Sequence, residues 1–349
     1  MNPEPIRIEP IFSPRLWGAR SLAPLYPEKT NLPEPLGEAW LTGLDCRIAS
    51  GPFAGKKLGE AWREMPADWR GARLASTPEF PILVKFIFPT EKLSIQVHPG
   101  DEYAAAHEQA AGGRGKTEMW HAVSAEPGAH VLVGLKPGVN KAKFLEGLAA
   151  QTLENLLESH AVHSGDTFFV PAGTPHTIGP GMVLCEIQEY SDLTYRVYDY
   201  GRVDAQGQPR ELQIEKALAV MNFGATSAPR VPRVSFWERG TEISLLAACR
   251  HFATERWELT STAGCHSDPD HFDIYVILAG QGQLEWPDGS AIYHRGEAWM
   301  IPASLGPFAL HPSAPTSLIR TYVPELGALR TALCREGASN SRIAEIIFD

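Results

Sequence analysis

The chain contains an internal repeat that constrains its fold more than any other feature of the sequence. Residues His163–Gly173 match residues His294–Ser304, with His, Gly, acidic, aliphatic, Pro and Ala positions recurring in the same order. A repeat of this kind indicates two related structural units. The copies then differ, because His176 lies five residues beyond the Pro of the first copy, whereas Pro307 holds the corresponding place in the second. We therefore expect two related β-units, of which only the first has kept its chemistry.

The apolar segments are short, rich in Val, Ile, Phe and Tyr, and bounded by Gly, Pro, Asp or Ser. Short strands at regular spacing with turn residues between them are typical of β-sandwiches and barrels. The clearest examples are residues 81–88, 130–133, 167–170, 182–187 and 274–278. The predicted fold is therefore dominated by strands: two β-barrel (jelly-roll) units with a few short helices.

Two segments show helical spacing of apolar residues, and one segment has the composition of a linker. The first helix is predicted near 141–159, after Asn140 as N-cap, and the second near 210–221. Residues 223–232 are rich in Pro, Gly, Ser and Thr. We therefore predict a metal-bearing catalytic unit over 1–225, which includes both helical segments, and a second, degenerate unit over 233–349.

Composition excludes several classes of protein. The 349 residues include 31 Lys+Arg and 41 Asp+Glu, a net charge of −10, which argues against a general nucleic-acid binder. An anionic small substrate remains compatible if a few cations gather in one place. The five cysteines form no CxxC pair, the first residues lack the pattern of a signal peptide, and no apolar run approaches the roughly 18 residues that cross a bilayer. A cytoplasmic protein without a membrane partner is expected, while its oligomeric state stays open.

A set of oxygen and nitrogen ligands surrounds the first copy of the repeat. The stretch Gly165–His176 matches the second signature of the cupin β-barrel superfamily, which usually pairs it with an upstream His-x-His and a Glu. Here the upstream positions are Gln96 and His98, which share one face if the segment is a strand, and the acidic candidate is Glu118. Without a thiolate, this set suits a catalytic Zn²⁺, or Mn²⁺, Fe²⁺ or Co²⁺.

Longer motifs give a more specific resemblance. The sequence resembles the type I mannose-6-phosphate isomerases, in their short bacterial form without a large helical insertion, strongly from about residue 10 to 225 and weakly beyond. The segments that carry this are Leu93–Pro99, Lys116–His121, Val170–His176 and Glu186–Asp199, with Trp17–Gly18 and Gly37–Trp40 near the amino terminus.

The resemblance implies a role for each matching residue. Gln96, His98, Glu118 and His176 match the family's metal ligands, usually for one zinc ion per chain. The residues that match substrate-binding positions are Arg196, at the substrate, and Lys85 and Ser94, at the phosphate. The residues that match proposed proton-transfer groups are Lys116, Glu186 and Asp192. A departure from the family pattern occurs at Leu193, where many relatives have Asn.

The implied reaction interconverts mannose 6-phosphate and fructose 6-phosphate through a cis-enediol. Such an isomerase needs a Lewis acid for the enediolate charge and a general base with a pKa near neutral. Glu186 and Asp192 are both candidates for the base, and Arg196 suits either the phosphate or the oxyanion.

The residues also allow simpler interpretations. Lys85 can extend from a strand edge into solvent, Ser94 can be an ordinary strand hydroxyl, and Arg196 can pair with Asp192 or Asp199. Glu186 can face the barrel interior or solvent. Two other functions also remain: another cupin isomerase, acting on glucose 6-phosphate or a free sugar, and a non-catalytic sugar-binding bicupin. The bicupin gives no reason for Lys116, Glu186 and Arg196 to accompany the ligands.

Overall fold

Strands dominate the computed structural model, which describes residues 2–349 except 204–205, 225–228 and 239–240. The first barrel consists of two antiparallel sheets. The six-stranded sheet has the order β2 (Ile11–Ala19), β3 (Leu36–Trp40), β4 (Ile82–Ile87), β11 (Met182–Glu189), β6 (Glu118–Ala125) and β9 (Thr167–Val170). The five-stranded sheet has the order β12 (Tyr195–Tyr198), β5 (Ile95–Val97), β10 (His176–Ile178), β7 (His130–Leu135) and β8 (Leu157–Ala161).

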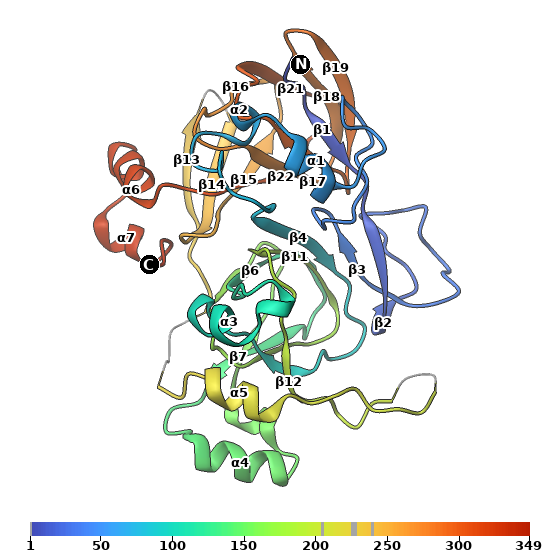
Figure 1. Ribbon diagram of the computed structural model, residues 1–349, viewed down its shortest axis with the longest axis vertical. Coiled ribbons are helices and arrows are strands. Elements are labelled where there is room, and N and C mark those ends of the chain that lie inside the picture. The colour runs from blue at the N-terminus through green and yellow to red at the C-terminus, as the bar shows by residue number, and fades with distance from the viewer. Residues whose placement is uncertain (1, 204–205, 225–228, 239–240) are drawn as a thin grey trace.

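The second barrel repeats this two-sheet plan, as the sequence repeat predicts. Its seven-stranded sheet has the order β1 (Ile6–Ile8), β20 (Ala298–Ile301), β17 (Asp273–Ala279), β22 (Thr316–Tyr322), β15 (Ala253–Leu259), β14 (Thr241–Ala248) and β13 (Val234–Glu238). Its four-stranded sheet has the order β16 (Ala263–His266), β21 (Pro307–Pro312), β18 (Gln281–Trp286) and β19 (Gly289–His294). Figure 1 shows the two barrels stacked along the long axis.

The repeated sequence forms the same turn in both barrels. The backbone N–H of His163 donates to Asp166 at 2.8 Å, and that of His294 donates to Glu297 at 3.0 Å. Gly165 and Gly296 have φ of +88° and +84°, a conformation that favours glycine. The repeated His, Gly and acidic residue therefore build the turn that leads into β9 and β20.

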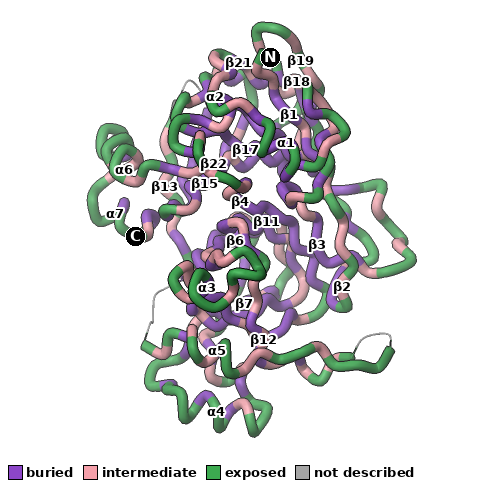
Figure 2. The backbone as a smooth tube through the Cα atoms, in the orientation of Figure 1, coloured by how far each residue is buried: buried purple, intermediate pink, exposed green. Residues whose placement is uncertain are grey.

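The two barrels share their largest apolar core. Ile82, Val84 and Phe86 of β4 belong to one buried cluster with Ile274 and Val276 of β17. Because the other face of β4 points into the first barrel, all six of its residues are buried, which explains an almost continuous apolar run. Figure 2 shows buried backbone concentrated where β4 and β11 lie against the second barrel.

Short helices connect and cover the sheets. They are α1 (Leu58–Glu64), α2 (Ala67–Arg70), α3 (Asp101–His107), α4 (Lys141–Ala149), α5 (Ile214–Val220), α6 (Leu326–Arg335) and α7 (Asn340–Ala344), with 3-10 turns η1 (Gln109–Ala111) and η2 (Leu153–Leu156). Asn140 caps α4 as predicted, since its side chain accepts from the N–H of Lys143 at 3.0 Å. Among the described residues, no helix is long and apolar enough to cross a membrane.

The predicted helices are longer than the observed ones. The segment 141–159 is helical only to Ala149, and Leu157–Ala161 is strand β8, paired with β7. The leucines that suggested one helix therefore divide between a helix, a 3-10 turn and a strand. The segment 210–221 becomes helical only at Ile214, because Gln213 still has a non-helical backbone.

The amino-terminal strand crosses the predicted boundary between the units. The prediction assigned residues 1–225 to the first unit, but β1 pairs with β20, with Ile6 opposite Met300. The sheet of the second barrel is thus completed by residues from the other end of the chain.

Candidate metal centre and active site

The register of the first barrel brings four predicted ligands together. Gln96 of β5 lies opposite His176 of β10, His98 follows β5 directly, and Glu118 begins β6 in the facing sheet. Glu118 Oε1 lies 3.6 Å from His98 Nε2 and 3.3 Å from His176 Nε2. His98, Glu118 and His176 are buried and form a group of side chains that can hold a metal ion.

The two histidines are oriented by backbone carbonyls. Nδ1 of His98 lies 2.7 Å from the carbonyl oxygen of Leu193, and Nδ1 of His176 lies 2.9 Å from that of Thr174. A carbonyl only accepts, so Nδ1 carries the proton and Nε2 presents a lone pair to the centre. Burial lowers the pKa of both imidazoles, to about 4 for His176. Neutral imidazoles held in this way are typical of metal ligands.

Several buried polar atoms at this centre form no hydrogen bond. They are His98 Nε2 and Glu118 Oε1, whereas Glu118 Oε2 lies 3.0 Å from the ammonium of Lys116. Such atoms are costly unless a ligand satisfies them. The Gln96 amide nitrogen lies 3.3 Å from His176 Nε2, while Ser94 Oγ donates to its oxygen at 3.3 Å. Exchanging the two amide positions, which have the same shape, turns the oxygen towards the centre. This donor set fits a divalent cation with two imidazoles and a carboxylate.

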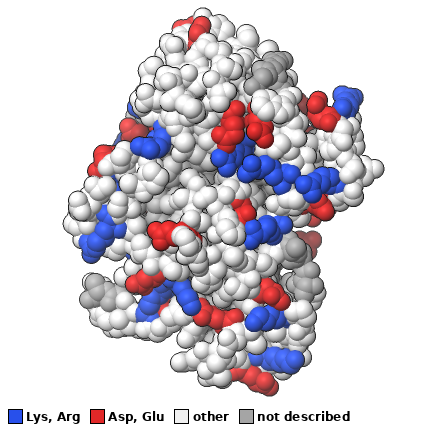
Figure 3. Space-filling model, turned by 180° about the vertical axis from the view of Figure 1, so that it is seen from behind, with Lys and Arg blue, Asp and Glu red and all other residues white. Residues whose placement is uncertain are grey.

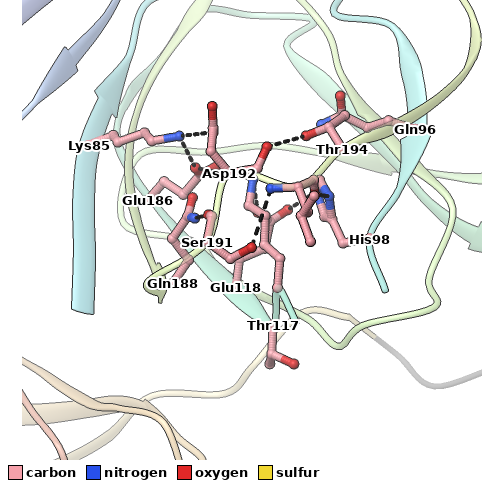
Figure 4. Close-up of polar contacts among 12 residues, drawn as sticks. Lys85, Gln96, His98, Thr117, Glu118, Glu186, Gln188, Ser191, Asp192 and Thr194 are labelled. Atoms are coloured by element: carbon pink, nitrogen blue, oxygen red, sulfur yellow. Dashed lines mark hydrogen bonds and ion pairs between the residues drawn. The ribbon is translucent and has the colours of Figure 1, made fainter. Parts of the chain in front are cut away.

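Four charged side chains lie beside the centre. Lys85 Nζ lies 2.9 Å from Asp192 and 3.8 Å from Glu186 Oε1 (Figure 4). Lys116 Nζ lies 3.8 Å from the same oxygen of Glu186. The other oxygen of Glu186 accepts from the indole N–H of Trp120 at 3.1 Å. Glu186 therefore faces the barrel interior and sits between two ammonium groups, which settles the question of its face.

The environment separates the pKa values of these groups. Burial raises the pKa of Glu186 to about 7, although Lys116 and Lys85 oppose the shift. Burial also acts on Asp192, but Lys85 and Lys116 hold the pKa of its carboxyl below its usual range. For Lys116, the nearby carboxylates of Glu118, Glu186 and Asp192 outweigh burial and raise the pKa. The site thus combines cationic lysines with one carboxyl group that titrates near neutral pH.

These side chains line one pocket of about 270 Å³. Its wall includes Ser94, Gln96 and Arg196 together with the four charged residues above. Arg196 Nε donates to Ser94 Oγ at 3.3 Å, and Nη1 donates to the backbone carbonyl of Glu211 at 3.1 Å. Gln96 lies in the pocket wall and opposite His176, and Lys116, also in the wall, lies 3.0 Å from Glu118, so the pocket lies beside the candidate metal centre.

The structure does not show the simpler interpretations of Arg196, which was to pair with Asp192 or Asp199, and of Lys85, which was to extend into solvent. Asp199 is held by Arg210 at 2.5 Å and by Arg202, and Asp192 is held by Lys85 rather than by Arg196. Lys85 is fully buried and lies over the ring of Trp40, with its ammonium 4.3 Å from the ring centre. It does not extend from a strand edge into solvent.

Three charged residues of the pocket were missed in the sequence. Arg15 of β2, Glu38 of β3 and Arg210 all line it. Arg15 Nη2 bonds Glu38 at 2.5 Å, and Glu38 also accepts from the indole of Trp40 at 3.0 Å. The sequence feature that could have identified Glu38 is the segment Gly37–Trp40, which resembles the isomerase family but was given no role.

The net charge of the chain does not reveal the basic residues that gather in the pocket. On the face in Figure 3, groups of Lys and Arg lie next to groups of Asp and Glu. The net charge of −10 is therefore a property of the whole surface, whereas the pocket gathers Lys85, Lys116, Arg15, Arg196 and Arg210.

The described residues of the second barrel do not reproduce the candidate metal centre of the first. Glu118 pairs with Val170 before the Pro of the first repeat, and Asp273 pairs with Ile301 before the Pro of the second. Asp273 therefore occupies the position of Glu118, while Pro307 replaces His176. In the part of the chain that the structure describes, no group of three His, Cys, Asp or Glu side chains from this barrel brings its ligand atoms together.

Comparisons with known proteins find relatives over most of the chain. A family model described as "Mannose-6-phosphate isomerase, cupin domain" matches residues 241–323. The chain is 32% identical to the probable mannose-6-phosphate isomerase GmuF of Bacillus subtilis, over 88% of this chain and 96% of the relative. It is 31% identical to the mannose-6-phosphate isomerase ManA of the same organism, over 89% and 96%.

Solved structures show the same fold. The crystal structure of the mannose 6-phosphate isomerase from Bacillus subtilis matches with a TM-score of 0.83 and 28% identity, over 91% of this chain and 99% of that one. A zinc-bound mannose 6-phosphate isomerase matches with a TM-score of 0.72 and 17% identity, over 92% and 100%. The predicted architecture of two cupin-like barrels is thereby confirmed.

Proposed function

The chain belongs to the mannose-6-phosphate isomerase family, and we propose that it interconverts mannose 6-phosphate and fructose 6-phosphate in the pocket of the first barrel. The observation that carries the proposal is the placement of Glu186. Its carboxyl group lies between Lys85 and Lys116, on the wall of a pocket that lies beside the group formed by His98, Glu118 and His176.

Gln96, His98, Glu118 and His176 are the residues that would hold one divalent cation per chain. The orphaned atoms of His98 and Glu118 support this assignment, and the zinc-bound relative supports zinc as the metal. When bound, the cation supplies Lewis-acid stabilisation for negative charge on the sugar oxygens O1 and O2.

Glu186 is the proposed proton carrier. As a carboxylate it takes the proton from C2 of mannose 6-phosphate, which leaves the electron pair in the cis-enediolate, and it returns the proton to C1. A pKa of about 7 suits both steps near neutral pH. Lys116, 3.8 Å from Glu186, is placed to move the hydroxyl proton between O2 and O1. Asp192 is the weaker candidate for the base, because it pairs with Lys85 and its pKa is lowered.

Arg196 and Ser94 are the proposed phosphate contacts. Their direct contact at 3.3 Å presents a guanidinium and a hydroxyl on one side of the pocket. A planar guanidinium can bind two phosphate oxygens at once. Lys85 contributes positive charge to the pocket wall. It is not free to reach towards the phosphate, because its ammonium already contacts Glu186 and Asp192.

Two alternatives follow from the same fold, and one assay separates them. The purified protein is offered mannose 6-phosphate, glucose 6-phosphate and free mannose, and fructose 6-phosphate or fructose is measured. The proposal requires turnover of mannose 6-phosphate above the other two. Preference for glucose 6-phosphate or the free sugar supports another cupin isomerase, and binding without turnover supports a sugar-binding bicupin. The lysine and carboxylate cluster argues against the bicupin, since sugar binding alone gives no reason for it.

We place the enzyme in the cytoplasm, where phosphorylated sugars are found. None of the five cysteines, all within the described residues, forms a disulfide, which supports a reducing compartment. The proposed partner is the small phosphorylated sugar itself.

A further inference from the structure

A turn of the second barrel contacts Asp101 and Glu189 of the first barrel. It joins β14 to β15 and carries Arg250 and His251. His251, Asp101 and Glu189 form a group whose ligand-type atoms lie within 4.8 Å of one another. Asp101 begins α3 in the first barrel and Glu189 ends β11. This cluster is therefore a polar contact between the barrels, outside the substrate pocket.

The turn contacts both carboxyl groups of this cluster. Arg250 Nη2 donates to Asp101 Oδ2 at 2.6 Å, and Arg250 Nε donates to His251 Nε2 at 2.9 Å. Because Nε2 of His251 accepts, its Nδ1 carries the proton and lies 3.3 Å from Glu189 Oε2. Burial lowers the pKa of His251 below its usual value.

The two carboxyl groups in turn hold the segment that leads to Glu118. Asp101 Oδ1 accepts from the N–H of Gly115 at 2.9 Å, and Glu189 Oε1 accepts from the N–H of Thr117 at 2.6 Å. The N–H between them, that of Lys116, donates to the carbonyl of Pro99 at 2.9 Å. Three successive amides are thus fixed directly before a metal-ligand candidate.

The same contacts tie this segment to the other ligand-bearing segment. Pro99 and Asp101 follow His98 in the chain, and a Cβ on Gly115 would come within 2.6 Å of the Asp101 backbone nitrogen. The backbone of 99–101 and that of 115–117 therefore lie in close contact. Their relative position sets the spacing between His98 and Glu118.

We propose that Arg250 and His251 are positioning residues for the metal centre: they hold Asp101 and Glu189, whose carboxyl groups fix the segments that carry His98, Lys116 and Glu118. This inference rests on the metal site and reaction proposed above. It assigns the second barrel a task in the chemistry of the first, although its own described residues form no metal-binding cluster.

The test compares Arg250→Met with the control Arg330→Met. Both arginines are partly exposed and each pairs with one carboxylate, but the partner of Arg330 is Asp349 at the carboxyl terminus. Zn²⁺ affinity is measured by competition with a chromophoric chelator, kcat and KM are measured on mannose 6-phosphate, and thermal unfolding is followed in the metal-free proteins.

Arg250→Met and His251→Ala are each expected to weaken Zn²⁺ binding about tenfold, the lower end of what loss of an outer-shell partner causes. We expect kcat to fall by a similar factor with KM within twofold, while Arg330→Met matches the parent. Arg250→Lys, which can still reach Asp101, is expected to recover most of the Zn²⁺ affinity.

Parental Zn²⁺ affinity and kcat in both Arg250→Met and His251→Ala would overturn the inference. The inference would also be overturned if Arg250→Lys did not recover the lost Zn²⁺ affinity. It would be overturned as well if the losses of Zn²⁺ affinity came with a lower unfolding temperature of the metal-free protein than that of Arg330→Met. If the parent binds Zn²⁺ but does not isomerise mannose 6-phosphate, the proposed function fails, and the Zn²⁺ affinities still decide the role of the turn.

Discussion

Glu186 and Arg320 occupy the same register position in the two barrels. Glu186 pairs with Trp120 on one side and Lys85 on the other, whereas Arg320 pairs with Tyr275 and Glu255. The charges are inverted, since the lysine–glutamate pair of the first barrel becomes a glutamate–arginine pair in the second. Together with Asp273 in place of Glu118, this inversion puts an internal ion network where the first barrel has the site proposed for proton transfer.

The first prediction concerns that network. Arg320 lies 3.2 Å from Glu255 and 3.1 Å from Asp273, and all three are largely buried. Arg320→Met leaves two carboxylates without their cation, so the free energy of unfolding is expected to fall by about 3–5 kcal/mol. Urea unfolding measures this change.

A surface pair provides the control for this experiment. Arg7→Met, which removes the half-exposed pair with Glu297, is expected to cost about 1 kcal/mol or less. Replacing Arg320, Glu255 and Asp273 together by apolar residues should restore much of the loss. An Arg320→Met protein as stable as Arg7→Met would contradict the network.

The second prediction concerns the metal ligands. His176→Ala removes an imidazole whose Nε2 faces Glu118 at 3.3 Å, so bound Zn²⁺ and turnover should be lost together. His294→Ala is the matched control, because His294 starts the second copy of the repeat and is largely exposed. Metal analysis and kcat of both variants check the assignment. Loss of metal in His294→Ala, but not in His176→Ala, would place the working centre in the other barrel.

The third prediction concerns pH. A base with a pKa of about 7 is protonated and inactive below that value, so kcat/KM should rise with pH up to about 7 and then level off. If Asp192 were the base, its lowered pKa would give no rise in kcat/KM near neutral pH. Glu186→Gln should abolish turnover. Zn²⁺ content is measured at each pH, because protonation of the ligands also removes activity. If kcat/KM rose only below pH 5, at constant Zn²⁺ content, Glu186 would be excluded as the base.

The fourth prediction concerns phosphate recognition. Arg196→Ala should raise KM for mannose 6-phosphate about tenfold to a hundredfold, the equivalent of about 1.5–3 kcal/mol for hydrogen bonds to a charged group. Arg20→Ala, at an arginine bound to the backbone of Leu32 and absent from the pocket wall, should match the parent. Unchanged kinetics of Arg196→Ala would locate the anion site elsewhere.

Much of the first barrel could be predicted because its chemistry lies in short motifs. Gln96, His98, Glu118 and His176 were each recognisable locally, and the strand register then brought them together. The sequence repeat likewise predicted two barrels. Both copies keep the acidic residue that forms the turn before β9 and β20, so the repeat is visible in the sequence.

Other features depend on contacts between distant segments. The apolar spacing of 141–159 does not reveal that Leu157–Ala161 pairs with β7, and the isolated Arg15 does not reveal its contact with Glu38. The pairing of β1 with β20 joins the two ends of the chain, so no local pattern predicts it. The contact of His251 with Asp101 and Glu189 was not predicted for the same reason, since it joins residues of the two barrels.

We propose that a metal ion bound in the first barrel is required to isomerise mannose 6-phosphate. The direct measurement is a coupled assay of fructose 6-phosphate formation, with metal analysis of the same sample before chelation, after chelation and after addition of Zn²⁺. We predict about one metal ion per chain with turnover, loss of both on chelation, and recovery of both with Zn²⁺. Full turnover of mannose 6-phosphate by metal-free protein would contradict the account.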